Sequence, residues 1–454
     1  MTSSPSSSSG LASPEELEQR AKTLLSIVRR QARRPYVVEL AGTPKAGKTS
    51  ALHVLKSFFK ECGYQVQLMR ERASDCPIAI KGHFFFNTWT TTTMIASMLE
   101  NLDTEADILL LDRGVFDSIV WLEDQSRAGQ VTPEERKIFR DFALLDRWRS
   151  LTDLTCVLTV TPEVAMQREN ASLLVPRSGS IVSGKFLSRY NSVLATVRED
   201  VDDLFNFVDI DTSEHEPRHV HHHLASALIE RMHHWVDPEI AAIPRATAEA
   251  LFGDQPVLDL ASSIGAIQRE VVSRPRSVLE RDEGFVQLVA AAVLRNDGKV
   301  LLVRRSAEDD EKRVTFGRDL LWKGCHVPRP DASGTDVVAM ASSALEERLK
   351  EDFYLARLDS ELRPWVLVWS RNPREVRHLG IVFDLEIPNA ELARSLTGKV
   401  FKRDRNRTRI KLQELVRPTE LHARMASAGG ELQLESWSRD LLDHEVRRGG
   451  GVSQ

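Results

Sequence analysis

The chain has 454 residues, and its 61 lysines and arginines nearly balance its 66 aspartates and glutamates, giving a formal net charge of −5. This length favours two domains over one core, and the mixed charge argues against a nucleic-acid partner. Four scattered cysteines without a C-x-x-C pair, no apolar run of membrane-spanning length and no signal peptide predict a cytoplasmic protein with no membrane partner.

The first predicted element is a helix that follows a serine-rich tail. Residues 1–14 can bury almost nothing, and we expect them to be disordered. At the end of this tail Ser13 is a good N-cap, Pro14 suits the first helical position, and Glu16 completes a capping box. Apolar side chains then recur at helical spacing as far as Val28.

A phosphate-binding pattern, G-x-x-x-x-G-K-[ST], follows. It consists of Gly42, Thr43, Pro44, Lys45, Ala46, Gly47, Lys48 and Thr49. The pattern lies between an apolar run, 36–41, that predicts a buried strand and an amphipathic run, 48–60, that predicts a helix. Backbone N–H groups at such a helix N-terminus point at an anion. We predict that the loop binds ATP, with Lys48 neutralising the β- and γ-phosphates and Thr49 coordinating Mg²⁺. The alternative is a chance glycine-rich turn.

Strands and helices alternate through the first half of the chain. Further strands are expected at 64–69, 107–113, 155–160 and 205–210, and helices at 88–102, 115–127, 132–148 and 185–200, with one more opening at 161 and a last one ending near 235. This alternation predicts an α/β domain with a doubly wound parallel sheet over residues 15–236. Its ligands should lie at the carboxyl ends of the strands.

Charged residues stand where those strands end. Glu71 follows the second strand, Asp112 and Arg113 end the third, and Arg168 and Arg177 come after the fourth. Together with the phosphate loop, this order resembles the deoxynucleoside kinase and thymidylate kinase group over about 35–212. The resemblance implies a carboxylate base toward the acceptor hydroxyl, an arginine that holds acceptor or phosphate, and a mobile lid that supplies arginines to the phosphoryl group.

We predict as catalytic residues Lys48, Glu71, Asp112, Arg113, Arg168 and Arg177, with Thr49 and Asp112 at the metal ion. Such roles fit phosphoryl transfer, which depends on positioning and charge neutralisation. Plainer interpretations stay open. Glu71 could be a solvated charge at a strand end, Asp112 with Arg113 a structural ion pair, and Arg177 an ordinary loop cation.

Two residue clusters in this half also have structural interpretations. Phe84 to Phe86 and Trp89 could line an acceptor-base pocket by stacking, although an aromatic cluster more often belongs to a core. His215, His219 and His223 stand one helical turn apart, as metal ligands can. No cysteine or clustered carboxylate accompanies them, so a solvated helix face is favoured.

The second half of the chain has a different pattern. Residues 237–280 contain several prolines and no clear strand, and we expect a linker with helical pieces near 246–251 and 257–271. An α+β domain should follow at 281–454. Its predicted elements are a hairpin of 285–294 and 300–304 around Asn296-Asp297-Gly298, helices at 337–353 and 434–446, and strands at 365–369 and 380–387.

This second domain resembles a divergent Nudix domain over about 284–446. The resemblance rests on the hairpin, on residues 321–327 and on the helix run 344–352. It implies a helix whose glutamates bind Mg²⁺ and cleave a nucleoside diphosphate derivative, here through Glu347, Glu351 and Asp352. The family helix reads Arg-Glu-hydrophobic-x-Glu-Glu-x-Gly, whereas this chain inverts the first pair to Glu347-Arg348 and has Tyr354 in place of the glycine.

The structural alternative for that helix is an ordinary charged surface. A basic run nearby, made up of Lys399, Lys402, Arg403, Arg405, Arg407 and Arg409, could attract phosphates or be a solvated loop.

The sequence therefore leads to two functional hypotheses. The first is an ATP- and Mg²⁺-dependent kinase of a nucleoside, nucleotide or similar small acceptor, joined to a Nudix-like domain that hydrolyses or senses a related nucleotide. The second is a nucleotide-sensing regulatory protein, with the phosphate loop as a switch and a Nudix-like part that binds without cleaving. Either protein could form a homodimer.

Overall fold

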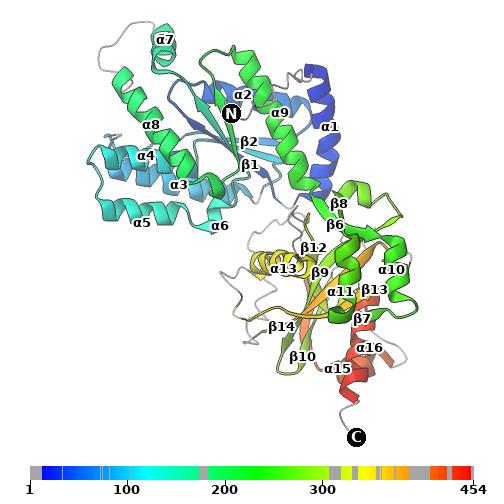
Figure 1. Cartoon of the computed structure of the whole chain (residues 1–454). Coiled ribbons are helices and arrows are strands. Elements are labelled where there is room, and N and C mark those ends of the chain that lie inside the picture. Colours follow the sequence, from blue (N-terminus) through cyan, green and yellow to red (C-terminus); the bar gives the residue numbers. More distant parts are fainter. Residues whose placement is uncertain are drawn as a thin grey trace, which may run out of the picture. The chain divides into compact units, whose positions relative to one another are not determined.

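The computed structural model describes residues 13–32, 34–71, 73, 75–80, 82–102, 104–172, 183–305, 318–329, 336–353, 358, 360–372, 375–387, 410–426 and 432–450. These residues form two compact units, which divide after Val236 (Figure 1). Nearly all of the expected tail, residues 1–12, lies outside the described residues.

The first unit contains a parallel five-stranded sheet. Its strands are β1 (Tyr36–Gly42), β2 (Val66–Met69), β3 (Ile108–Asp112), β4 (Leu154–Thr159) and β5 (Phe207–Asp211). Their order is β2-β3-β1-β4-β5, and every pairing is parallel. The predicted α/β fold with a doubly wound sheet is confirmed. Strand β1 is fully buried and central in the sheet. Its carboxyl end therefore lies in the middle of the row formed by the carboxyl ends of the five strands.

Helices cover both faces of this sheet, as Figure 1 shows. One layer contains α1 (Pro14–Gln31), α2 (Lys48–Glu61) and α9 (Pro217–Val236), and the other contains α3 (Phe84–Leu102), α4 (Val115–Arg127) and α8 (Gly184–Asp200). Shorter elements are α5 (Pro133–Ala143), α6 (Asp146–Arg149), α7 (Pro162–Ser172) and the 3₁₀ turn η2 (Asp202–Leu204). The alternation along β1 explains the two layers: Val38 and Leu40 pack on the first, and Ala41 packs on the second.

Local signals placed most helix ends in this unit correctly. Ser13 and Glu16 form the predicted capping box at the start of α1. Two boundaries differ. Helix α3 begins at Phe84, one turn before the expected start, and the expected helix at 132–148 is split into α5 and α6 because Leu145 adopts an extended ψ of 125°.

The second unit is built on a mixed sheet of ten strands. They are β6 (Glu239–Pro244), β7 (Val257–Asp259), β8 (Val272–Pro275), β9 (Phe285–Asn296), β10 (Lys299–Arg305), β11 (Asp319–Leu320), β12 (Trp322–His326), β13 (Arg363–Trp369), β14 (His378–Glu386) and β15 (Ile410–Val416). Strand β9 pairs in parallel with β14 and antiparallel with β6, β10 and β12. The predicted hairpin turn is present, since Asp297 and Gly298 have φ values of 49° and 68°.

Two helical layers also cover this sheet. Helices α10 (Arg245–Phe252), α11 (Leu260–Glu270) and α13 (Val337–Phe353) pack on one face. Helices α15 (Pro418–Ala426) and α16 (Ser436–Gly450) belong to the other face, and α12 (Arg276–Leu279) follows β8. Strand β9 reads as a continuous apolar run because its alternate side chains enter both cores.

The structure corrects the expectation of a linker at 237–280. Strand β6 pairs with β8 and β9, and β7 pairs with β13, so the segment is part of the second sheet. The two expected helical pieces are present as α10 and α11, the latter beginning only after β7. Strands β7 and β8 were missed because they are short, with three and four residues, and each of the three strands runs directly into a helix.

No helix in the described part of the chain combines the length and hydropathy that a membrane span needs.

Candidate active site

The phosphate-loop residues form one turn between β1 and α2. Three of them have positive φ: Gly42 at 119°, Lys45 at 67° and Gly47 at 94°. A Cβ atom on Gly42 would lie 2.0 Å from the carbonyl oxygen of Leu158 on the neighbouring strand β4. The first glycine is therefore required both by its conformation and by the close approach of β4.

Lys48 and Thr49 begin helix α2 directly after this turn. The Nζ of Lys48 donates hydrogen bonds to the carbonyl oxygens of Gly42 (2.7 Å) and Thr43 (2.8 Å), and the residue is only 7% exposed. Burial, together with the nearby charge of Arg113, lowers the pKa of Lys48 to about 8. The Thr49 hydroxyl donates to Asp112 across 3.1 Å. The two predicted metal ligands therefore lie together at the mouth of the loop.

Side chains from the later part of the unit brace the loop. The Thr43 hydroxyl donates to Asn191 of α8 (2.7 Å), and Lys45 forms an ion pair with Glu169 of α7. Arg168 donates to the carbonyl oxygen of Lys45 (3.2 Å) and to that of Thr212 (2.6 Å). In this structure Arg168 therefore supports the loop backbone, while its predicted contact with phosphate stays a prediction.

The turn after β3 depends on a buried carboxylate that the sequence analysis missed. Glu39 of β1 is fully buried and accepts three backbone hydrogen bonds, from Gly114 (2.9 Å), Phe116 (3.2 Å) and Asp117 (2.9 Å). A Cβ atom on Gly114 would lie 2.5 Å from this carboxylate. Glu39 thus caps the N-terminus of α4 with a side chain from strand β1. A negative charge at this position also interacts favourably with the helix dipole.

This turn presents Arg113 to the cleft. Arg113 has a φ of 70°, its Nη1 donates to Asp117 (3.0 Å), and its Nε lies 3.2 Å from Glu71. The guanidinium also lies over the ring of Trp121, 5.4 Å from its centroid. Burial raises the pKa of Glu71 above its ordinary value, against the opposing effect of Arg113. A raised pKa brings a carboxylate closer to the range in which a general base works.

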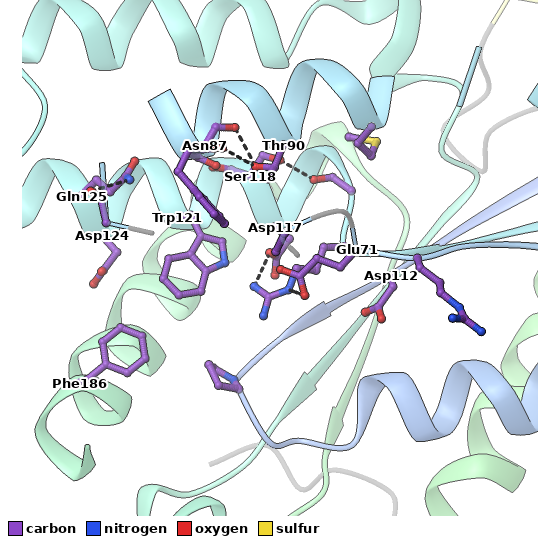
Figure 2. Close-up of a pocket in the computed structure, with 18 of the residues that line it drawn as sticks. Glu71, Asn87, Thr90, Asp112, Asp117, Ser118, Trp121, Asp124, Gln125 and Phe186 are labelled. Atoms are coloured by element: carbon purple, nitrogen blue, oxygen red, sulfur yellow. Dashed lines mark hydrogen bonds and ion pairs between the residues drawn. The ribbon is translucent and has the colours of Figure 1, made fainter. Parts of the chain in front are cut away.

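A cavity of about 660 Å³ extends from the loop between α3, α4 and α8 (Figure 2). Its volume lies within the ordinary range for small-molecule sites. At the loop end its walls include Pro44, Lys45, Glu71, Asp112, Arg113, Asp117 and Glu169, and at the inner end Phe86, Asn87, Thr90, Ser118, Trp121, Asp124, Gln125, Phe186 and Arg189. Two residues of the predicted phosphate loop, Pro44 and Lys45, thus line the same continuous space as the predicted site residues Glu71, Asp112 and Arg113.

The inner end of the cavity combines an aromatic wall with fixed polar groups. The rings of Trp121 and Phe186 are nearly parallel, 22° apart, with centroids separated by 6.0 Å. Gln125 donates from Nε2 to the carbonyl oxygen of Gly82 (3.1 Å), while its buried Oε1 has no hydrogen-bond partner among the described residues. Arg189 pairs with Asp124 at 2.7 Å. Figure 2 shows Trp121, Asp124, Gln125 and Phe186 around the same end of the pocket. An unsatisfied acceptor there would favour a ligand that carries an N–H or O–H donor.

The structure brings most, but not all, of the predicted site residues together. Arg177 lies outside the described residues, so its predicted catalytic role stays a prediction. Of the aromatic cluster, Phe86 lines the cavity, Phe84 packs against Phe139 and Phe85 is 61% exposed. Within the described chain no group of three or more His, Cys, Asp or Glu side chains could hold a metal ion. His215, His219 and His223 are all exposed.

Little or nothing in the sequence indicates that several of the cavity residues belong to the site. Asp117 follows Arg113 at helical spacing and could have been proposed as its ion-pair partner. Arg189 and Asp124 are 65 positions apart, and nothing local connects them. Gln125 lies within an unremarkable helix.

In the second unit, helix α13 spans the residues predicted from the sequence, Val337–Phe353. Lys350 contacts Glu346 (2.8 Å) and the predicted metal ligand Glu347 (3.0 Å). Glu351 and Asp352 continue the helix, although their side chains lie outside the described atoms. Tyr354 and the basic run 399–409 lie outside the described residues altogether.

Comparison with known proteins gives only distant likenesses. No family model matches the chain, and no curated protein matches it. Among solved structures, Tm1382, described as a candidate Nudix hydrolase, is 18% identical, with a TM-score of 0.32 over 46% of this chain and 99% of that one. Two structures of the deoxyadenosine kinase from M. mycoides also match. The form with bound dCTP is 16% identical, with a TM-score of 0.33 over 43% and 98% of the two chains. The form with bound dCMP and dCDP is 15% identical, with a TM-score of 0.35 over the same shares. Scores and identities this low assign the chain to neither family.

The Glu39 cap yields a testable prediction. Glu39→Gln keeps the side-chain size but places an NH₂ group against backbone donors, so the first unit should lose about 2 to 3 kcal/mol of unfolding free energy. Burial raises the pKa of Glu39 to about 7, so at pH 5 the folded-state carboxyl is mostly uncharged. Urea denaturation at pH 5 would therefore measure the loss with little buried charge relieved by the substitution. Hydrogen exchange should quicken at the first turn of α4. The exposed Glu163→Gln is the matched control. Equal stability of the two variants would show that the cap is dispensable.

Proposed function

We propose that this chain is a kinase that uses ATP and Mg²⁺ to phosphorylate a nucleoside, nucleotide or similar small acceptor in the cleft of its first unit. The second unit, in this proposal, is a Nudix-like domain that binds a nucleotide diphosphate derivative. The acceptor is a small molecule, and the proposal needs neither nucleic acid nor a membrane.

The observation that carries the kinase proposal is the contact between Thr49 and Asp112. A hydroxyl at the start of the phosphate-loop helix and a carboxylate at the end of the adjacent strand are the pair that holds Mg²⁺ in phosphate-loop enzymes. Their 3.1 Å contact brings them close enough to share an ion. With the ion bound, the metal would supply charge neutralisation at the phosphates, and Lys48 would add a second positive charge there.

The acceptor side is supported by what lies next to this pair. Glu71 and Arg113 contact each other at 3.2 Å, and both line the cavity that continues to Trp121 and Phe186. A planar base held by the aromatic wall would point its hydroxyl-bearing part back toward the carboxylate. Glu71 would then accept the hydroxyl proton while Arg113 fixes the sugar or phosphate oxygen atoms.

The alternative, a nucleotide sensor, is favoured by one feature of the second unit. Glu347 is engaged by Lys350 of its own helix, and Arg348 stands where the Nudix pattern has a metal ligand. Positive charges on that helix face oppose the binding of several Mg²⁺ ions. The proposal therefore gives the second unit binding without fast hydrolysis, whichever activity the first unit has.

The kinase proposal predicts acceptor-stimulated ADP formation in a panel of nucleosides and nucleotides. Glu71→Gln and Arg113→Lys should each lower transfer to the preferred acceptor at least about a hundredfold, with ATP affinity within about threefold of wild type. Lys48→Ala should instead weaken ATP binding itself, and the exposed Lys60→Ala of the same helix should do neither. Tight ATP binding with no transfer to any acceptor would contradict the kinase proposal and support the nucleotide-sensor alternative.

A second prediction concerns pH. The buried Lys48 has a pKa of about 8 in this structure, so above pH 8 it is increasingly neutral and would have to take up a proton to pair with phosphate. ATP affinity should be constant below pH 8 and fall by about tenfold per unit as pH rises above it. Calorimetric titrations in buffers of different ionisation enthalpy should detect proton uptake at pH 9. No uptake, and a flat affinity from pH 7 to 9.5, would show that Lys48 stays charged.

A third prediction addresses the second unit. The test uses the Lys48→Ala variant of the whole chain, in which nucleotide binding at the phosphate loop is weakened. In this variant hydrolysis of nucleotide diphosphate derivatives should be slow, and adding Glu351→Gln should change the rate little. Restoring the Nudix order with Glu347→Arg and Arg348→Glu together should raise the rate, because a carboxylate then replaces the guanidinium at the metal position. Rapid turnover in the starting protein that Glu351→Gln abolishes would make the second unit an active hydrolase.

A further inference from the structure

A small basic pocket lies in the second unit, at the end of the sheet where β9 and β14 begin. Its volume is about 200 Å³, and it is lined by Arg245, Glu283, Phe285, Arg371, Val376 and Arg377. These residues come from the start of α10, the start of β9 and the connection between β13 and β14. Three guanidinium groups, two from the β13–β14 connection and one from α10, thus line a space together with one carboxylate and two apolar side chains.

Backbone hydrogen bonds hold this arrangement in place. Arg371 donates to the carbonyl oxygen of Gly253, and Arg377 donates to that of Glu280 at 2.5 Å. The backbone N–H of Arg245 donates to Gly284 at 2.8 Å, which ties α10 to the segment before β9. Because uncharged carbonyl groups position two of the guanidinium groups, their placement does not depend on the carboxylates nearby.

Those carboxylates are poorly held. The partners are Asp254 for Arg371 (3.3 Å), Glu283 for Arg377 (2.9 Å) and Glu249 for Arg245 (3.0 Å), with side chains 101%, 73% and 51% exposed. Exposed ion pairs of this kind contribute little to stability, and their carboxylates can return to water at small cost. A ligand with more charge in a smaller volume can therefore replace them.

The positive charge also acts on the neighbouring residue. Burial, with added effects of Arg276 and Arg377, lowers the pKa of His378 to about 4. His378 is consequently neutral near pH 7 and neither repels nor attracts an anion. The arginines are left to set the sign of the pocket.

We propose that this pocket binds the phosphate group of a small phosphate ester or diphosphate. Arginine suits this task because its planar fork can donate two parallel hydrogen bonds to phosphate oxygen atoms. Phe285 and Val376 would form an apolar wall that limits water around the anion. The volume is below that of sites for whole drug-sized ligands, so the pocket fits a phosphate or diphosphate head with the remainder of the ligand outside.

This site is independent of the proposed kinase activity, and its test removes the phosphate loop from consideration. Inorganic pyrophosphate would be titrated by calorimetry, without Mg²⁺, into full-length Lys48→Ala. We expect saturable binding, weakened at least about tenfold by Arg371→Gln with Arg377→Gln. Arg269→Gln with Arg363→Gln removes the same charge from exposed positions of the same unit and should leave the affinity unchanged.

A further variant protects the test against loss of folding. Glu283→Gln removes the competing carboxylate from the pocket and should tighten pyrophosphate binding, an outcome that an unfolded protein cannot produce. Three results would overturn the proposal. They are no binding in Lys48→Ala, equal weakening by the control pair, and no gain in affinity for Glu283→Gln.

Discussion

A single buried carboxylate determines the geometry of the cleft in the first unit. Glu39 lies within the central strand β1 and accepts three N–H groups from the turn that follows β3. That turn carries Asp112 toward Thr49 and Arg113 toward Glu71. The strand that leads into the phosphate loop therefore also fixes the residues beside the loop, so both sides of the cleft share one rigid support.

The charged side chains of the cleft have polar partners within the protein. Lys48 donates hydrogen bonds to carbonyl oxygens of its own loop. Arg113 forms ion pairs with Asp117 and Glu71, and Arg189 forms one with Asp124. In the proposed function, a nucleotide would take Lys48 from those carbonyl groups, and a metal ion would separate the Thr49 hydroxyl from Asp112. Binding therefore exchanges internal polar contacts for ligand contacts, which favours ligands that offer equally strong acceptors.

The sequence predicted what is encoded locally. The phosphate loop, the capping box of α1, the hairpin turn at Asp297-Gly298 and both ends of α13 follow from residue types at fixed spacings. Long-range pairings were not predictable in this way. Glu39 looked like one polar residue in an apolar strand, the partner of Arg189 is 65 positions away, and β7 is too short to show a period. Likewise, only the fold shows that Arg245, Arg371 and Arg377 share a pocket.

The pairing of β6 with both β8 and β9 has a consequence for dissecting the chain. A fragment that starts at residue 281, where the hairpin pattern begins, would lack β6, β7 and β8. The outer side of β13 and part of β9 would then present unpaired N–H and C=O groups in apolar strands. Such open edges recruit other strands, so this fragment would tend to aggregate, whereas a cut after Val236 leaves every pairing of the described sheet intact.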